Sequence, residues 1–238
     1  MFLVSGKLYS QEERTENFTG FGFHYGIDIP AGDLSDRFGQ NFHAGVSLEL
    51  FRAKLKGMMR LEASIFFGPN VKEDVISSLR SPNGAVLGNN GDYVDVFLRQ
   101  RGAYIGMLAN KVLIPNKSNA NAGFAAGFGL GYLQHKVRFQ IDSENAPQLT
   151  GDYAKGYDRN SVGPALKQNF SYLHIGKNKS LNYEVSLYFI EAFTVNNRPI
   201  NFDTGMKDDG RRLDIFIGLD LRWIIPVKDS QVAGEIFY

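Results

Sequence analysis

The chain has 238 residues, and its 26 Lys and Arg nearly balance its 25 Asp and Glu, leaving a formal net charge of +1. This balance argues against a nucleic-acid partner, because surfaces that bind DNA or RNA carry an excess of Lys and Arg. Cysteine is absent from the sequence, which excludes disulfides, thiolate metal sites and a cysteine nucleophile. The sequence contains no run of about 20 apolar residues that would predict a transmembrane helix.

Alternation of apolar and polar residues predicts β-strands from the beginning of the chain. In residues 20–29, Phe21 and Phe23 alternate with Gly22 and His24. The same alternation recurs in seven further segments: 42–50, 59–67, 94–114, 123–132, 166–174, 181–189 and 213–223. The 94–114 segment loses its phase around residues 100–102, which predicts a β-bulge there.

The connections between these segments alternate in length. Residues 30–41, 68–92, 142–161 and 194–211 form long connections, whereas 52–57, 114–121 and 176–180 form short ones. This pattern predicts an all-β fold, an eight-stranded antiparallel up-and-down transmembrane β-barrel with short periplasmic turns and long extracellular loops. The expected barrel covers residues 11–226. Residues 1–10 are interpreted as a signal-peptide remnant or a disordered terminus, and residues 227–238 as a periplasmic C-terminal tail.

Alternation alone does not decide which face meets lipid, because a soluble lipocalin-like barrel alternates in the same way. The volume of the barrel interior does decide it. An eight-stranded barrel is just wide enough inside for side chains to fill it. Bulky residues such as Phe21, Phe124 and Phe128 would overfill that space, whereas the glycines opposite them fit within it. We therefore expect the apolar face to contact lipid and the glycine-rich face to line the lumen.

The predicted lumen face carries both signs of charge in nearly equal number. An unpaired buried charge costs several kcal/mol, so these groups are expected to pair and to plug the lumen. The predicted network contains Asp28, Glu49, Arg60, Glu62, Asp95, Arg99, Arg101, Lys167, Glu184, Asp214, Asp220 and Arg222.

Signatures of catalysis and of metal binding are weak. The four histidines, His24, His43, His135 and His174, form no zinc-binding motif, and the serines form no nucleophile elbow. An enzyme with a site at the barrel rim would use His24 with Asp28, although a structural charge network explains the same two residues. We therefore expect no enzymatic activity, no catalytic, cofactor-binding or metal-binding residue, and no small-molecule substrate.

Several segments resemble PorG, the outer-membrane barrel family of the type IX secretion system. The most distinctive is the stretch from Gly151 to Leu166, which contains Gly-Asp-Tyr, Lys-Gly-Tyr-Asp-Arg and Gly-Pro-Ala-Leu. Residues 30–39, 131–136, 193–204, 212–214 and 223–226 continue the pattern. The resemblance implies a non-enzymatic barrel, integral to the bacterial outer membrane and in contact with its lipids. It also implies contact with the periplasmic ring proteins PorK and PorN.

The predicted short turns are basic, and the expected tail ends in aromatic residues. With both termini in the periplasm, the candidate contacts for a periplasmic partner are Lys54, Lys56, Lys177, Lys179, Phe237 and Tyr238. Lysines in turns also serve simply to keep a surface soluble, and that interpretation remains open. The alternative function is that of a generic OmpA- or OmpX-like barrel that is structural or binds a ligand with its outer loops.

Overall fold

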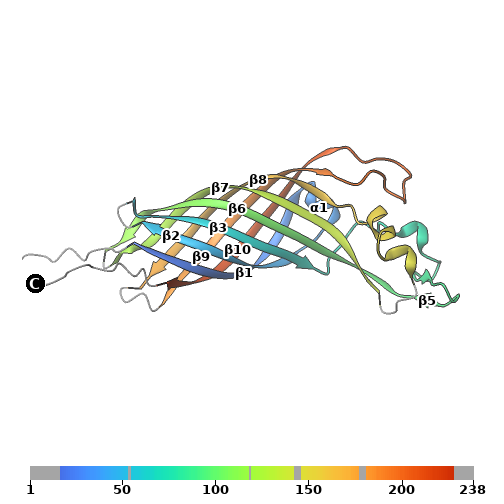
Figure 1. The fold of residues 1–238 in the computed structure, drawn as a ribbon, viewed down its shortest axis with the longest axis horizontal. Coiled ribbons are helices and arrows are strands. Elements are labelled where there is room, and N and C mark those ends of the chain that lie inside the picture. Colours follow the sequence, from blue (N-terminus) through green and yellow to red (C-terminus); the bar gives the residue numbers. More distant parts are fainter. Residues whose placement is uncertain (1–16, 53–54, 118, 142–145, 177–180, 228–238) are drawn as a thin grey trace, which may run out of the picture.

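The computed structural model describes residues 17–52, 55–117, 119–141, 146–176 and 181–227. Eight long strands close into one antiparallel barrel (Figure 1). They are β1 (Phe18–Gly32), β2 (Asn41–Arg52), β3 (Gly57–Gly68), β6 (Val96–Asn116), β7 (Asn119–Ile141), β8 (Ser161–Ile175), β9 (Asn182–Asn196) and β10 (Arg211–Val227). Each strand pairs with its neighbours in sequence, and β10 pairs with β1. The predicted eight-stranded up-and-down barrel is confirmed. Residues 1–10 lie outside the described residues, as does the predicted tail apart from Val227, which is the last residue of β10.

The two ends of the barrel differ, as the connection lengths predict. The turn end carries the short connections 53–56, 117–118 and 176–181. The loop end, at the right in Figure 1, carries the connections 33–40, 69–95, 142–160 and 197–210. These contain α1 (Leu34–Arg37), η2 (Ser77–Leu79), β4 (Val86–Leu87), β5 (Tyr93–Val94), η3 (Pro147–Leu149) and η4 (Tyr153–Gly156). Which end faces the periplasm stays a prediction.

The strand pairing fixes how narrow the barrel is. Starting at Phe21 and following the paired residues around all eight strands leads back to β1 at Ala31, ten residues further along. Such a stagger tilts the strands strongly against the barrel axis. A barrel of eight tilted strands has room inside for side chains but not for a wide channel.

The outer wall is apolar over most of its height, and the inner wall carries the glycines. Phe21 is 53% exposed and Phe124 is 60% exposed, although both lie in the middle of a sheet. At Gly26, on the inner wall, an added Cβ would lie 2.1 Å from the carbonyl oxygen of Leu219 and 2.3 Å from Cε1 of His43. The predicted assignment of the two faces is therefore correct. Among the described residues, no helix is long and apolar enough to cross a membrane.

The lumen is filled in three layers. An apolar layer at the turn end consists of Phe18, Phe51, Met58, Val112, Ala125, Leu173, Ile175 and Ile224. A second apolar cluster at the loop end includes Phe66 and Phe216, whose stacked rings have centroids 4.5 Å apart, and loop residues such as Leu34, Val75 and Ile76. The loop-end connections thus fold over the mouth of the barrel. The polar layer lies between these two apolar layers.

Strands β6 and β7 are the longest, with 21 and 23 residues, and their loop-end halves extend as a ribbon beyond the other strands (Figure 1). The β-bulge predicted at residues 100–102 is wrong, because pairing runs without interruption from Val96 to Val112. The register shifts instead near the turn end, between Val112 and Ile114 and between Pro115 and Asn116. The change of pattern has another cause. In the ribbon the inner face becomes apolar, with Val96 and Val137 buried, and the outer face becomes charged.

Candidate functional site

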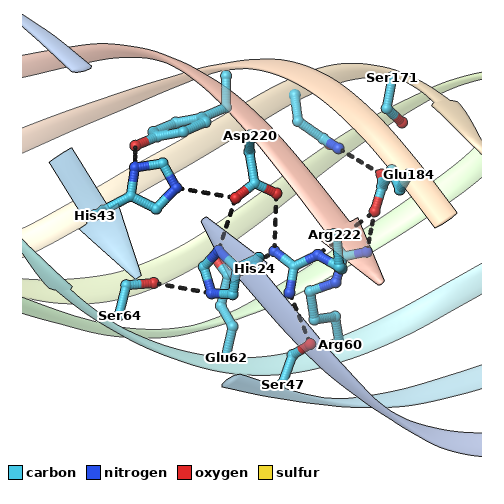
Figure 2. A network of polar contacts seen from close by, with 12 residues as sticks. His24, His43, Ser47, Arg60, Glu62, Ser64, Ser171, Glu184, Asp220 and Arg222 are labelled. Atoms are coloured by element: carbon cyan, nitrogen blue, oxygen red, sulfur yellow. Dashed lines mark hydrogen bonds and ion pairs between the residues drawn. The ribbon is translucent and has the colours of Figure 1, made fainter. Parts of the chain in front are cut away.

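Arg222 of β10 lies at the centre of the polar layer. Its guanidinium nitrogens lie 3.0 Å from Glu62, 3.4 Å from Asp220, 3.6 Å from Glu49 and 3.7 Å from Glu184. These carboxylates come from β2, β3, β9 and β10, so one side chain joins strands from opposite sides of the barrel. Figure 2 shows this arrangement, including the hydrogen bond from Arg222 to Ser47.

Two further cations complete the charge pairing. Arg60 donates from Nε to both oxygens of Glu49, at 2.7 and 2.9 Å, and a second nitrogen of Arg60 bonds Glu184. Lys167 of β8 pairs with Glu62, and its ammonium lies 4.5 Å from the centre of the Tyr188 ring. Because all these side chains are buried, the pairing removes the cost of isolated charges in the lumen.

His43 bridges two aspartates at the loop-end edge of this layer. Its Nδ1 lies 2.9 Å from Asp28, and its Nε2 lies 2.9 Å from Asp220. With both carboxylates ionised, a ring that faces a carboxylate oxygen with each nitrogen donates to both only as the doubly protonated cation. Tyr188 donates its hydroxyl proton to the other oxygen of Asp28. His43 therefore acts here as another lumen cation.

Ser64, His24 and Asp220 lie in the order of a catalytic triad (Figure 2). The Ser64 hydroxyl is 3.3 Å from Nε2 of His24, and Nδ1 of His24 is 2.7 Å from Asp220. A nucleophile of this kind also needs room for a substrate beside it. All three residues are buried, and the two apolar layers close the lumen on either side of them. The arrangement thus satisfies the polar groups of these buried residues.

His24 and Asp220 also form, together with His43, the one metal-like cluster within the described part of the chain. Ligand atoms of His24, His43 and Asp220 all lie within 4.8 Å of one another. Each of these atoms already has a hydrogen-bond partner in the protein, and Arg222 lies 3.4 Å from the second oxygen of Asp220. A cation placed here would face that guanidinium. The sequence holds no spacing motif for this cluster, and its only signal is that all three residues lie on lumen-facing positions.

Asp214 belongs to a separate cluster nearer the loop end. It accepts hydrogen bonds from Arg37 at 2.9 Å, from His135 at 2.7 Å and from Thr194 at 2.5 Å. Arg37 belongs to α1, in the first loop-end connection, and it also bonds Ser161 at 3.2 Å. This cluster ties α1 to the inner wall.

Arg159 ties the other loops together. Its guanidinium bonds Asp203 and Glu73, which lie in two different loop-end connections. Burial lowers the pKa of Arg159, but the hydrogen bonds to Asp203 and Glu73 outweigh it, so its pKa is raised overall. Nearby, Arg198 pairs with Asp158 through two nitrogens. The loop-end cap is therefore held by ion pairs between loops as well as by its apolar cluster.

The structure places nine of the predicted network residues on the buried lumen face: Asp28, Glu49, Arg60, Glu62, Lys167, Glu184, Asp214, Asp220 and Arg222. It also adds the uncharged Ser47, Asn110 and Asn169. Three predicted residues need correction. Asp95 is exposed, and Arg99 and Arg101 lie on the outer face of β6. They belong to the ribbon beyond the apolar belt, where the polarity of the two faces is reversed.

Of the candidate partner contacts at the turns, only Lys56 lies among the described residues. It is exposed in the β2–β3 turn with a left-handed φ of 46°, and its carbonyl accepts the Val112 N–H at 2.8 Å. Lys54, Lys177, Lys179, Phe237 and Tyr238 lie outside the described residues.

Comparison with known proteins returns structural likeness alone. No protein-family model and no curated protein matches this sequence. Among solved structures, Ail of Yersinia pestis, crystallised with the heparin analogue sucrose octasulfate, has 8% identity and a TM-score of 0.45, covering 88% of this chain and 99% of its own. A major outer membrane protein of Thermus thermophilus has 10% identity and a TM-score of 0.44, covering 87% and 98%. The outer membrane protein OprG of Pseudomonas aeruginosa has 13% identity and a TM-score of 0.34, covering 87% and 94%.

Proposed function

We propose that this chain is a non-enzymatic barrel integral to a bacterial outer membrane, and that it works by contacts at its surface. The observation that carries this proposal is the combination of a lumen filled in three layers with an apolar outer wall. The outer wall suits lipid and would be costly in water. The described side chains fill the lumen, so we place the working contacts on the outer surfaces of the barrel.

The partner we propose is the periplasmic ring of a type IX secretion system, built from PorK and PorN, which the chain would contact through its turn end. The support is the resemblance of several segments to the PorG family, and one of these segments contains Arg159, which holds the loop-end cap together. The exposed Lys56 places a cation at the turn end, where an acidic partner surface could bind it.

Crosslinking from each end of the barrel tests this role. A photoreactive residue replaces Lys56 at the turn end or, as the matched control, the exposed Lys207 in a loop-end connection. After irradiation, the barrel is extracted from its native outer membrane in mild detergent and its adducts are identified by mass spectrometry. We expect ring proteins to crosslink from position 56 and not from position 207. Ring proteins absent from both samples would remove the secretion role.

A barrel that binds a ligand with its loops is the second candidate. It is favoured by the fixed loop-end cap, in which Arg159 joins the 69–95, 142–160 and 197–210 connections. If this is the function, shortening the 197–210 connection abolishes adhesion of whole cells to the surface that the wild-type protein binds, while the barrel still inserts into the membrane. Adhesion that persists after shortening would reject this candidate.

A further inference from the structure

Four cations lie on the outer face of the ribbon that β6 and β7 form. Arg99 is paired directly opposite Arg138, and Arg101 directly opposite Lys136. Like charges placed directly opposite each other destabilise a sheet unless an anion lies between them. The sequence places these two opposed pairs next to each other, so the charge is concentrated on one small area of the wall.

Few groups of the protein itself neutralise these four cations. Arg99 bonds the amide oxygen of Gln140 at 2.9 Å, and Arg101 bonds the backbone carbonyl of Gln100 at 2.8 Å. Lys136 lies 3.9 Å from Asp158, a carboxylate that Arg198 already holds through two hydrogen bonds. Within the described ranges, no carboxylate pairs with Arg99, Arg101 or Arg138. The ribbon is therefore a cationic surface with capacity for an external anion.

A hollow of about 600 Å³ lies on the same wall, on the turn-end side of these cations. Three alanines, Ala44, Ala63 and Ala103, leave space between the larger side chains around them. The flanking residues that define the hollow are Val46, Ile65, Ile105, Tyr132 and Gln134. Each alanine is paired with a large residue on a neighbouring strand, as Ala103 is with Ile65. The result is an apolar furrow across β2, β3, β6 and β7.

The hollow and the cations are continuous. Ala103 lies two residues from Arg101 on the outer face of β6, and Gln134 lies two residues from Lys136 on β7. Ala103 and Gln134 are paired with each other, so they mark the boundary. A lipid in a bilayer has the same order, with phosphate immediately beyond the acyl chains.

We propose that this wall binds one phosphorylated acyl lipid from the leaflet at the loop end. This proposal rests on the membrane placement proposed above. An acyl chain lies in the hollow, and the phosphate groups bind the four ribbon cations, Arg99, Arg101, Lys136 and Arg138. Guanidinium groups suit this task because each donates two parallel hydrogen bonds to phosphate oxygens.

Binding of purified lipid A to the folded protein in detergent micelles tests the phosphate contacts. The probes are bis-phosphorylated lipid A, its fully dephosphorylated form and inorganic phosphate, each titrated and read by native mass spectrometry. We expect the bis-phosphorylated lipid to bind at least tenfold more tightly than the dephosphorylated one. The R99Q/R138Q variant should lose that preference. The K207Q/R211Q variant removes two exposed loop-end cations from elsewhere, with the same change in net charge, and should keep it.

Filling the hollow tests the acyl contact without changing charge. Ala103→Phe places a ring in the hollow and should weaken lipid binding, whereas Ala109→Phe, on the outer face of the same strand but outside the hollow, should not. Each variant is first checked for faster migration on an unheated detergent gel, which reports the closed barrel.

Three results would overturn the proposal: equal binding of both lipid forms, unchanged binding by R99Q/R138Q, or binding of inorganic phosphate without retention of lipid. A wild-type chain that stays soluble in water without detergent would instead overturn the membrane placement. The two failures are therefore distinguishable.

Discussion

Arg222 illustrates how a single residue holds the lumen together. Its guanidinium lies within 4 Å of Glu49, Glu62, Glu184 and Asp220, and each of these carboxylates is buried. Removing one partner from a buried pair leaves the other charge unpaired, and that cost exceeds the net value of the pair itself. The polar layer is thus sensitive to loss of its central cation.

Arg222→Met should therefore lower the free energy of unfolding by about 3–5 kcal/mol. The measurement is the urea midpoint of the loss of the fast-migrating, unheated form on a detergent gel. Arg99→Met, which removes an arginine from the outer face of β6, serves as the control and should change the free energy of unfolding by less than about 0.5 kcal/mol. Equal midpoints for the two variants would contradict the central role of Arg222.

Ser64 is the residue that distinguishes a structural polar layer from a hidden hydrolase. Its hydroxyl contacts His24, but both residues are buried beneath the apolar layers. We expect a fluorophosphonate probe to leave the folded barrel unlabelled. Ser64→Ala should also change the free energy of unfolding by no more than about 1 kcal/mol, the scale of one neutral hydrogen bond. Labelling of the wild-type chain that disappears in Ser64→Ala would establish a reactive serine.

At the scale of the strand, glycines set how closely the inner wall can pack. The Gly26 position has no room for a methyl group, because a Cβ there would lie 2.1 Å from the carbonyl oxygen of Leu219. Gly26→Ala should destabilise the barrel by about 1–3 kcal/mol, since the backbone of the neighbouring strand must shift. At Gly210, in a loop, the nearest atom is a carboxylate oxygen of Asp208 at 3.5 Å. The same urea midpoints should be unchanged for Gly210→Ala, and a similar loss in both variants would reject the packing argument.

The loop-end cap depends on Arg159, which joins three connections. Arg159→Ala should loosen the 197–210 connection, which keeps its Arg198–Asp158 pair, at a local cost of about 1.5–3 kcal/mol, the value of hydrogen bonds to charged groups. Limited proteolysis should then cut this connection at least tenfold faster while the unheated barrel still migrates as folded. Lys155→Ala removes an exposed pair with Asp152, and it should leave cleavage unchanged.

Strands β6 and β7 show how far the sequence predicts this fold. Alternation identifies each barrel strand because one wall meets lipid and the other meets the lumen. In the loop-end halves of β6 and β7 the inner face is apolar and the outer face is charged. Arg99 and Arg101 therefore lie on the outer face without any slip in register. Alternation marks that reversal only as the loss of phase at residues 100–102, and a β-bulge would leave the same mark in the sequence.

Across the whole molecule, the sequence predicts which wall is polar but not which side chains meet. His24, His43 and Asp220 lie far apart in the chain and converge only because the stagger of the strands brings their positions to one height in the lumen. The loop-end cap was not predicted for the same reason. Its apolar cluster combines residues from several connections, such as Val75 and Leu149, with the barrel wall.

A lumen filled from one end to the other should not conduct ions. Reconstituted into planar bilayers, the protein should give no unit conductance steps under applied voltage, whereas an open porin measured in the same bilayers does. Truncating one side chain should not change this result. Phe216→Ala removes a ring from the loop-end cluster, but the charged layer around Arg222 and the turn-end layer around Phe51 still close the path. Reproducible steps in the wild-type protein would show that the layers open in a membrane, and the barrel would then work through its lumen.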